Sequence, residues 1–209
     1  MVIFTAIVTV GMLTSVALAG GTSAVVQAEY ERLSHEMARM AERHIWTGVE
    51  RRYVELEALN VQLSQGDYTS GAYSAMDIGD VHAAYRRLEA ASKLSDSKEI
   101  TDWMTDIDAH FGYVELVAAR GDKGELTVTE MPFDLTQRKS IEFATQKVTE
   151  EGTFSGLLPR GEYQFCQQAF TVQPGISFRL EVSPAMRREG LVEPVILYRD
   201  EEGNPVNTP

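Results

Sequence analysis

The clearest pattern in the chain is a stripe of apolar and small residues that begins directly after Gly79-Asp80. Its members recur every three or four positions, as on the buried face of an amphipathic helix. They are Val81, Ala84, Tyr85, Leu88, Ala91 and Leu94. Arg86, Arg87, Glu89 and Lys93 fall off this stripe, so we expect their side chains at the surface. Glycine tolerates a positive φ at the end of a helix, and aspartate offers a hydrogen-bond acceptor at the start of the next. The pair therefore marks the boundary with an earlier helix, Asp67–Ile78, before which Gly66-Asp67 repeats the same signal.

Helical signals extend on both sides of this hairpin. Asp96 and Glu99 form a variant capping box, which predicts a third helix with an apolar inner face. That face carries Ile100, Met104, Ile107 and Phe111. Residues 24–65 lack proline and are rich in good helix formers, so they predict one long helix or two with a break near Trp46-Thr47-Gly48. We expect the apolar stripe before the break to project as an arm and the stripe after it to pack on the hairpin.

The pattern changes to alternation after Phe111-Gly112. Tyr113–Val117 and Glu125–Thr129 predict two strands, with Gly121–Gly124 as the turn between them. Further short strands are expected around turns at Pro159-Arg160-Gly161 and Gln173-Pro174-Gly175, with a last strand at Val195–Tyr198. Met131–Glu151 fits either a helix capped by Asp134 or an alternating strand, and we favour a helix or an irregular crossover. The chain is therefore predicted to be α+β, with a helical region over 24–111, a β region over 113–199 and a flexible tail over 200–209.

The first of two family resemblances lies in the helical hairpin. The run Gly79-Asp80-Val81 with Ala84, Leu88, Ala91 and Leu94 resembles the second helix of a tetratricopeptide (TPR) repeat. Tyr68, Gly71, Ala72 and Ala75 stand where the first helix of that family holds small or aromatic residues. The usual Trp and Leu-Gly are absent from this helix, and one full repeat is visible. The resemblance implies a TPR-like hairpin over about residues 66–110 and not a repeat array.

The second resemblance lies in the last third of the chain. It rests on the pattern G-x-F-x-x-L-L-P-x-G-x-Y followed by F-x-V-x-P-G, formed by Gly152, Phe154, Leu157, Leu158, Pro159, Gly161, Tyr163, Phe170, Val172, Pro174 and Gly175. This pattern resembles the carboxypeptidase regulatory-like (transthyretin-like) β-sandwich domains. The resemblance implies a β-sandwich over about residues 113–199 and a non-catalytic extracytoplasmic module.

The first residues are predicted to direct export. Val2–Leu18 is predominantly apolar and ends in Ala17-Leu18-Ala19 before Gly20, which suits cleavage of a signal peptide over residues 1–19. The alternative is a membrane anchor through residues 2–18, because this run is close to the lower limit of about 17 residues for a spanning helix. Either interpretation places the remainder outside the cytoplasm, in the periplasm or cell envelope. After cleavage, no membrane insertion is expected.

Charge and cysteine content narrow the classes of partner and site. The net charge of −12 argues against nucleic acid as a partner, because phosphate binding needs a basic face. The one cysteine, Cys166, excludes an intramolecular disulfide and a Cys-based zinc site. We expect it in a strand, as a structural thiol.

The one candidate site for chemistry is a helix face formed by Asp102, Asp106 and His110, which are four residues apart. Such a face either holds a divalent metal or is simply solvated, and we favour the solvated face because the sequence supplies no further ligands. There is no G-x-S-x-G elbow, phosphate loop or dinucleotide fingerprint. We therefore predict no catalytic, cofactor or metal residues. The expected function is that of an exported, non-enzymatic scaffold that binds proteins. The alternative is a small envelope hydrolase or metal-dependent enzyme that uses this face.

Overall fold

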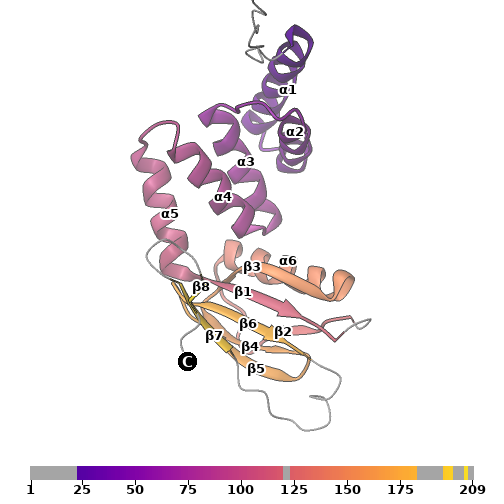
Figure 1. The fold of residues 1–209 in the computed structure, drawn as a ribbon, viewed down its shortest axis with the longest axis vertical. Helices are drawn as coiled ribbons and strands as arrows, with labels where there is room; N and C mark the ends of the chain where they lie inside the picture. The colour runs from indigo at the N-terminus through magenta and orange to yellow at the C-terminus, as the bar shows by residue number, and fades with distance from the viewer. Residues whose placement is uncertain (1–22, 120–122, 183–194, 200–204, 207–209) are drawn as a thin grey trace, which may run out of the picture.

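The computed structural model describes residues 23–119, 123–182, 195–199 and 205–206, and it shows a mixed α+β protein (Figure 1). The predicted signal peptide or anchor lies outside the described residues. The helices before the first strand are α1 (Ala24–Glu42), α2 (Trp46–Ala58), α3 (Gln65–Ile78), α4 (Val81–Ser92) and α5 (Lys98–His110). The strands, with one further helix among them, are β1 (Phe111–Val117), β2 (Leu126–Val128), α6 (Leu135–Glu151), β3 (Thr153–Pro159), β4 (Gly161–Phe165), β5 (Gln168–Val172), β6 (Ser177–Glu181), β7 (Val195–Arg199) and β8 (Pro205–Val206). The α+β prediction is confirmed. None of the helices in the described ranges is long and apolar enough to cross a bilayer.

Side-chain caps mark the starts of all the helices except α2, in two cases at a residue that the sequence pattern did not indicate. Gly79 ends α3 with a φ of 92°, and the Asp80 carboxylate accepts from Ala83 N–H at the start of α4, as predicted. Gly66-Asp67, however, lies inside α3, where Asp67 forms a capping box with Ser64. Similarly, Ser97 and not Asp96 caps α5. Both serines have extended backbone immediately before the helix, which directs the hydroxyl at the free N–H groups.

The region before α3 forms a second helical hairpin and not a projecting arm. Two helices are present, and the break lies at residues 43–45, where His44 has a φ of 54°. Leu33 and Met37 of α1 are buried in one core with residues of α2. The prediction of a free arm is wrong, because that apolar stripe packs on α2. Leu94, expected on the stripe of α4, lies beyond the end of that helix and is exposed.

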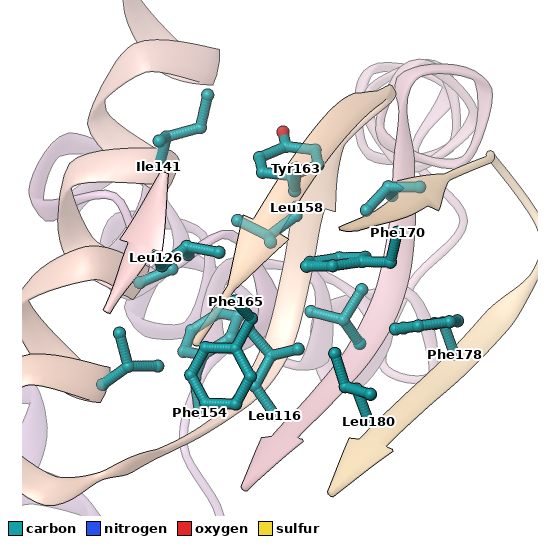
Figure 2. Packing of buried hydrophobic residues seen from close by; sticks show 14 of the residues in the cluster. Leu116, Leu126, Ile141, Phe154, Leu158, Tyr163, Phe165, Phe170, Phe178 and Leu180 are labelled. Atoms are coloured by element: carbon teal, nitrogen blue, oxygen red, sulfur yellow. The ribbon is translucent and has the colours of Figure 1, made fainter. Parts of the chain in front are cut away.

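Two sheets and α6 share the core of the C-terminal half. One sheet has the order β3-β1-β6-β7-β8 and the other β2-β4-β5; β1 pairs antiparallel with β3 and parallel with β6. Large side chains from both sheets point toward one another, including Leu116 and Leu180 from the first sheet and Phe165 and Phe170 from the second (Figure 2). The expected pairing of β1 with β2 is wrong, because these strands belong to different sheets.

The turn signals read from the sequence mark connections between the sheets. The turn at Arg160 leads from β3 in one sheet to β4 in the other, and Gln173-Pro174-Gly175 leads from β5 back to β6. The β4–β5 hairpin instead turns at Cys166-Gln167, where both residues have positive φ, 48° and 72°. Cys166 therefore lies in a turn and not in a strand.

The ambiguous segment Met131–Glu151 contains α6, which Asp134 caps. This helix packs against β2 and β3, which are edge strands of the two sheets, and it also contacts α3. The contact with α3 is close: a Cβ added at Gly79 would lie 2.3 Å from the carbonyl oxygen of Lys139. Helix α6 thus connects the helical half to the sheets (Figure 1). In the tail, Pro205–Val206 pairs with β7 as β8.

Candidate binding groove

One hollow in the described structure lies between α3, α5 and the start of α6. It is a cavity of about 600 Å³. A second cavity, of about 430 Å³, lies between the N-terminal parts of α3 and α5. Both are lined by Trp46 and Tyr73, so they meet at these two side chains. We call the two cavities together the aromatic groove.

A row of aromatic rings crosses the groove. Trp46 at the start of α2 stacks on Tyr73 of α3 with 5.7 Å between ring centroids, and Tyr73 lies 4.5 Å from Trp103 of α5. His44 continues the row beyond Trp46, at 5.5 Å. Tyr73 is 40% exposed although it touches rings on both sides. Aromatic rings of this kind combine a large apolar area with little conformational freedom, which suits them to binding proteins.

Carboxylates surround these rings. Asp77, Asp106 and Asp134 line one cavity, and Glu99 lines the other. The Tyr73 hydroxyl donates to Glu99 at 3.3 Å, and burial together with the charge of Glu99 raises the pKa of Tyr73. Lys139 is the one lysine or arginine that lines either cavity, and its ammonium pairs with Asp77 at 2.7 Å. The groove is therefore both aromatic and net acidic.

The predicted Asp102/Asp106/His110 face is divided by the fold. Asp106 and His110 line the groove, and His110 Nδ1 lies 2.8 Å from the Asp106 carbonyl oxygen and 3.2 Å from its carboxylate. Asp102 is instead ion-paired with Lys98 and lines neither cavity. In the ranges that the structure describes, no three His, Cys, Asp or Glu side chains gather in a way that could hold a metal ion.

A largely buried ion pair joins α4 to α2, the helix on which Trp46 lies, and it corrects one sequence prediction. Arg87 was expected at the surface but is buried, with its guanidinium bonded to both carboxylate oxygens of Glu50 at 2.5 and 2.7 Å. It also donates to the Gly71 carbonyl oxygen at 2.6 Å and lies 3.8 Å from the centre of the Tyr53 ring. Ser74 donates to Glu50 at 2.7 Å. These contacts join α2, α3 and α4 at one point.

The ion pair also determines the charge state of Glu50. Burial is the largest single influence and favours the neutral carboxyl, but the hydrogen bond and charge of Arg87, with the bond from Ser74, outweigh it and lower the pKa of Glu50. Gly71 makes the arrangement possible, because a Cβ there would lie 2.3 Å from the Tyr53 ring. Glycine in the middle of a predicted helix was the one sequence signal of this close approach.

A second polar cluster joins α1 to α3. Asp67 accepts from the Tyr30 hydroxyl, the Ser34 hydroxyl and the Ser64 hydroxyl at 2.6–2.7 Å. Asp67 is itself buried. Because a buried carboxylate is costly unless it is well bonded, these contacts fix the position of α1 on α3.

No family model, curated protein or solved structure matches this chain in the comparisons.

Proposed function

We propose that this protein is an exported, non-catalytic binding module of the cell envelope, which holds a segment of a partner protein in the aromatic groove. The observation that carries the proposal is the row Trp46–Tyr73–Trp103 in a groove with acidic residues on its lining; the central ring, Tyr73, is exposed, and the two tryptophans are half-buried. Exposed aromatic rings between polar groups are typical of the energetic centre of a protein interface.

The acidic lining indicates the chemistry of the partner segment. Asp106 and Asp134 lie in the same cavity as Trp103, whereas Lys139 is already paired with Asp77. A guanidinium or ammonium group is attracted both to carboxylates and to the face of an aromatic ring. We therefore expect a segment that combines basic and apolar residues.

The two family resemblances belong to this proposal. Consecutive helix pairs, α1–α2 and α3–α4, followed by α5, support a TPR-like arrangement of the helical half. Two sheets around one core support a carboxypeptidase regulatory-like β-sandwich in the C-terminal half. Both kinds of module commonly serve as scaffolds, and export through a signal peptide over residues 1–19 would place this one in the envelope.

A pull-down tests the proposal with the full exported chain as bait and an envelope fraction as the source of partners. Tyr73→Ala and Trp103→Ala shorten the aromatic row, and Tyr85→Ala is the matched control because Tyr85 lies outside the groove. We expect the parent and the control to retain the same partner and both groove variants to lose it. Equal capture by all four proteins would contradict a role for the groove.

A further inference from the structure

The outer edge of β2 carries backbone groups that no strand in the described ranges covers. Thr129 N–H donates to the Glu162 carbonyl oxygen and Cys166 N–H to the Glu125 carbonyl oxygen, so Glu125, Thr127 and Thr129 direct their backbone groups at β4. In an antiparallel pair the alternate residues point the other way. The N–H and C=O groups of Leu126 and Val128 therefore point away from β4, and no backbone partner for them lies within the described part of the chain.

A trough of about 580 Å³ lies beside this edge and is lined by residues of β2 and by one face of α6, which packs against β2. Its apolar surface comes from Val128 and Met131 on the strand side and Ile141 on the helix side. Met131 is 43% exposed. Figure 2 shows Leu126 of β2 and Ile141 of α6 on the same side of the core. Strand addition needs two features: a sheet edge with unpaired backbone groups and a pocket beside it. The partner's backbone forms hydrogen bonds with the edge, and its side chains fill the pocket.

The helix side of the trough is acidic. Glu142, Gln146 and Glu150 line it at intervals of four residues, so they form one row along α6. Glu142 and Glu150 are separated by about 12 Å at the helical rise of about 1.5 Å per residue. Residues four apart in a strand are separated by about 13 Å. Two basic residues four apart in an added strand would therefore match the two carboxylates.

The opposite edge of the same sheet lacks these features. By the same register, Ala169 and Thr171 of β5 direct their backbone groups away from β4. Neither residue lines any of the cavities described for this structure, and no helix in the described ranges makes extensive contact with β5. The β5 edge thus provides an internal comparison for β2.

We propose that the β2 edge and α6 form a second docking surface, which takes an extended partner segment with alternating apolar and basic residues as an added strand. This surface lies on the C-terminal half and shares no lining residue with the aromatic groove, so the proposal stands apart from the function proposed above.

The test uses a blocked seven-residue peptide of alternating valine and lysine, added to the full chain, with a peptide of alternating valine and glutamate as the control. Hydrogen exchange of individual amides is followed by NMR. We expect the basic peptide, and not the acidic one, to slow exchange of the Leu126 and Val128 amides at least tenfold.

Val128→Pro then removes one outward N–H without removing a bond to β4, since proline is tolerated on an edge strand when its N–H would face solvent. We expect at least a tenfold loss of peptide affinity at this edge, measured from the protection of the Leu126 amide, so that binding of the same peptide in the aromatic groove does not contribute. The matched control, Thr171→Pro, removes an outward N–H from the β5 edge and should bind as the parent does. Tyr73→Ala should leave the peptide-dependent protection of Leu126 and Val128 unchanged, which separates this surface from the aromatic groove.

Three results would overturn the proposal. The first is unchanged exchange at Leu126 and Val128 in the parent when the basic peptide is present, and this result does not depend on any variant folding. The second is equal affinity of the parent and a folded Val128→Pro variant. The third is protection of both amides in the peptide-free chain that rises with protein concentration, which would assign the edge to a second copy of this chain.

Discussion

The cores of the two halves of this molecule are packed with different kinds of side chain. In the helical half, Ala72, Ala75, Ala84 and Ala91 are completely buried, and polar groups such as Arg87 lie between the helices. In the β half, the core is built from large rings, with Phe165 completely buried. Small residues bring helices close together but contribute little apolar area, so hydrogen bonds and an ion pair must fix their relative positions. The three aromatic rings of the groove lie on helices of this half, whose relative positions depend on these polar contacts.

The largest expected effect comes from breaking the Arg87–Glu50 pair. Arg87→Ala leaves the Glu50 carboxylate without its partner between α2, α3 and α4. Removing one member of a buried pair typically costs about 3–5 kcal/mol, and we expect about 3 kcal/mol because the Glu50 side chain keeps 21% of its exposure. Denaturant unfolding followed by circular dichroism measures the loss. Arg86→Ala is the control, because the Arg86 side chain is exposed in the parent. A loss of unfolding free energy in Arg87→Ala no larger than that in Arg86→Ala would contradict a stabilising role for the ion pair.

Acidification should reduce the difference in unfolding free energy between the parent and Arg87→Ala. The folded-state pKa of Glu50 lies below its ordinary value of 4.5, so the pair contributes fully above about pH 4.5 and its contribution is lost as the pH falls through the lowered pKa. The gap in unfolding free energy between the parent and Arg87→Ala should therefore narrow between pH 5 and pH 3. A gap that widens on acidification would contradict the ionised state of Glu50.

The next largest loss of stability is expected when small residues of α4 are enlarged, because α4 packs closely against its neighbouring helices. Ala84→Leu or Ala91→Leu should cost roughly 1–3 kcal/mol, because the added side chain has no space at a completely buried position. The control is Ala90→Leu, at a partly exposed position on the same helix. Thermal melts of all three variants are compared with the parent. Melting temperatures equal to that of the parent for Ala84→Leu and Ala91→Leu would show that the helices are not packed this tightly.

A smaller change, a gain in stability, is expected in the β half. In the helical half, the left-handed position after α3 is occupied by Gly79, whereas the β4–β5 turn places Cys166 and Gln167 at positive φ. Two-residue hairpin turns of this kind favour Asn-Gly. Cys166→Asn combined with Gln167→Gly should therefore stabilise the chain by about 0.5–1 kcal/mol, because left-handed backbone costs other residues roughly 1–2 kcal/mol each. A lower melting temperature in the double variant would contradict this account of the turn.

The smallest effect concerns the face of α5. Replacing Asp102, Asp106 and His110 together by alanine should change stability by less than about 0.5 kcal/mol per residue, since all three are exposed. We expect no saturable rise in melting temperature when zinc or manganese ions are added to the parent or to this variant. A metal-dependent rise in the parent that the variant lacks would instead favour the metal-dependent enzyme, because ligands that bind only the folded state stabilise it.

The comparison also explains which features could be predicted from the sequence. Val81, Ala84, Leu88 and Ala91 were predicted to form a buried stripe, and all four are buried, because a helical period identifies the face with the most apolar contact. The same helical period places Arg87 off the apolar stripe, so this residue was predicted to lie at the surface. It could not show that α4 has neighbours on two sides, nor that Glu50, 37 residues earlier, lies opposite.

In the β half, the strand positions were predicted more reliably than their partners. Alternation locates a strand but does not determine the sheet to which it belongs, so the connection at Arg160 was read as a simple turn between neighbouring strands. The hairpin at Cys166-Gln167 was missed because neither residue is a usual turn former. The aromatic groove was missed for a related reason: Trp46, Tyr73 and Trp103 come from three different helices, and only the packing of those helices brings the rings together.

The two tryptophans of this chain, Trp46 and Trp103, both line the aromatic groove, so intrinsic fluorescence tests the central claim directly. The titrant is a blocked peptide of leucine and arginine, compared with one of leucine and glutamate. We expect a saturable change in tryptophan emission with the basic peptide, none with the acidic peptide, and at least a tenfold loss of affinity in Tyr73→Ala. Unchanged emission with the basic peptide, or an equal response in Tyr73→Ala, would contradict the claim that this groove binds a basic partner segment.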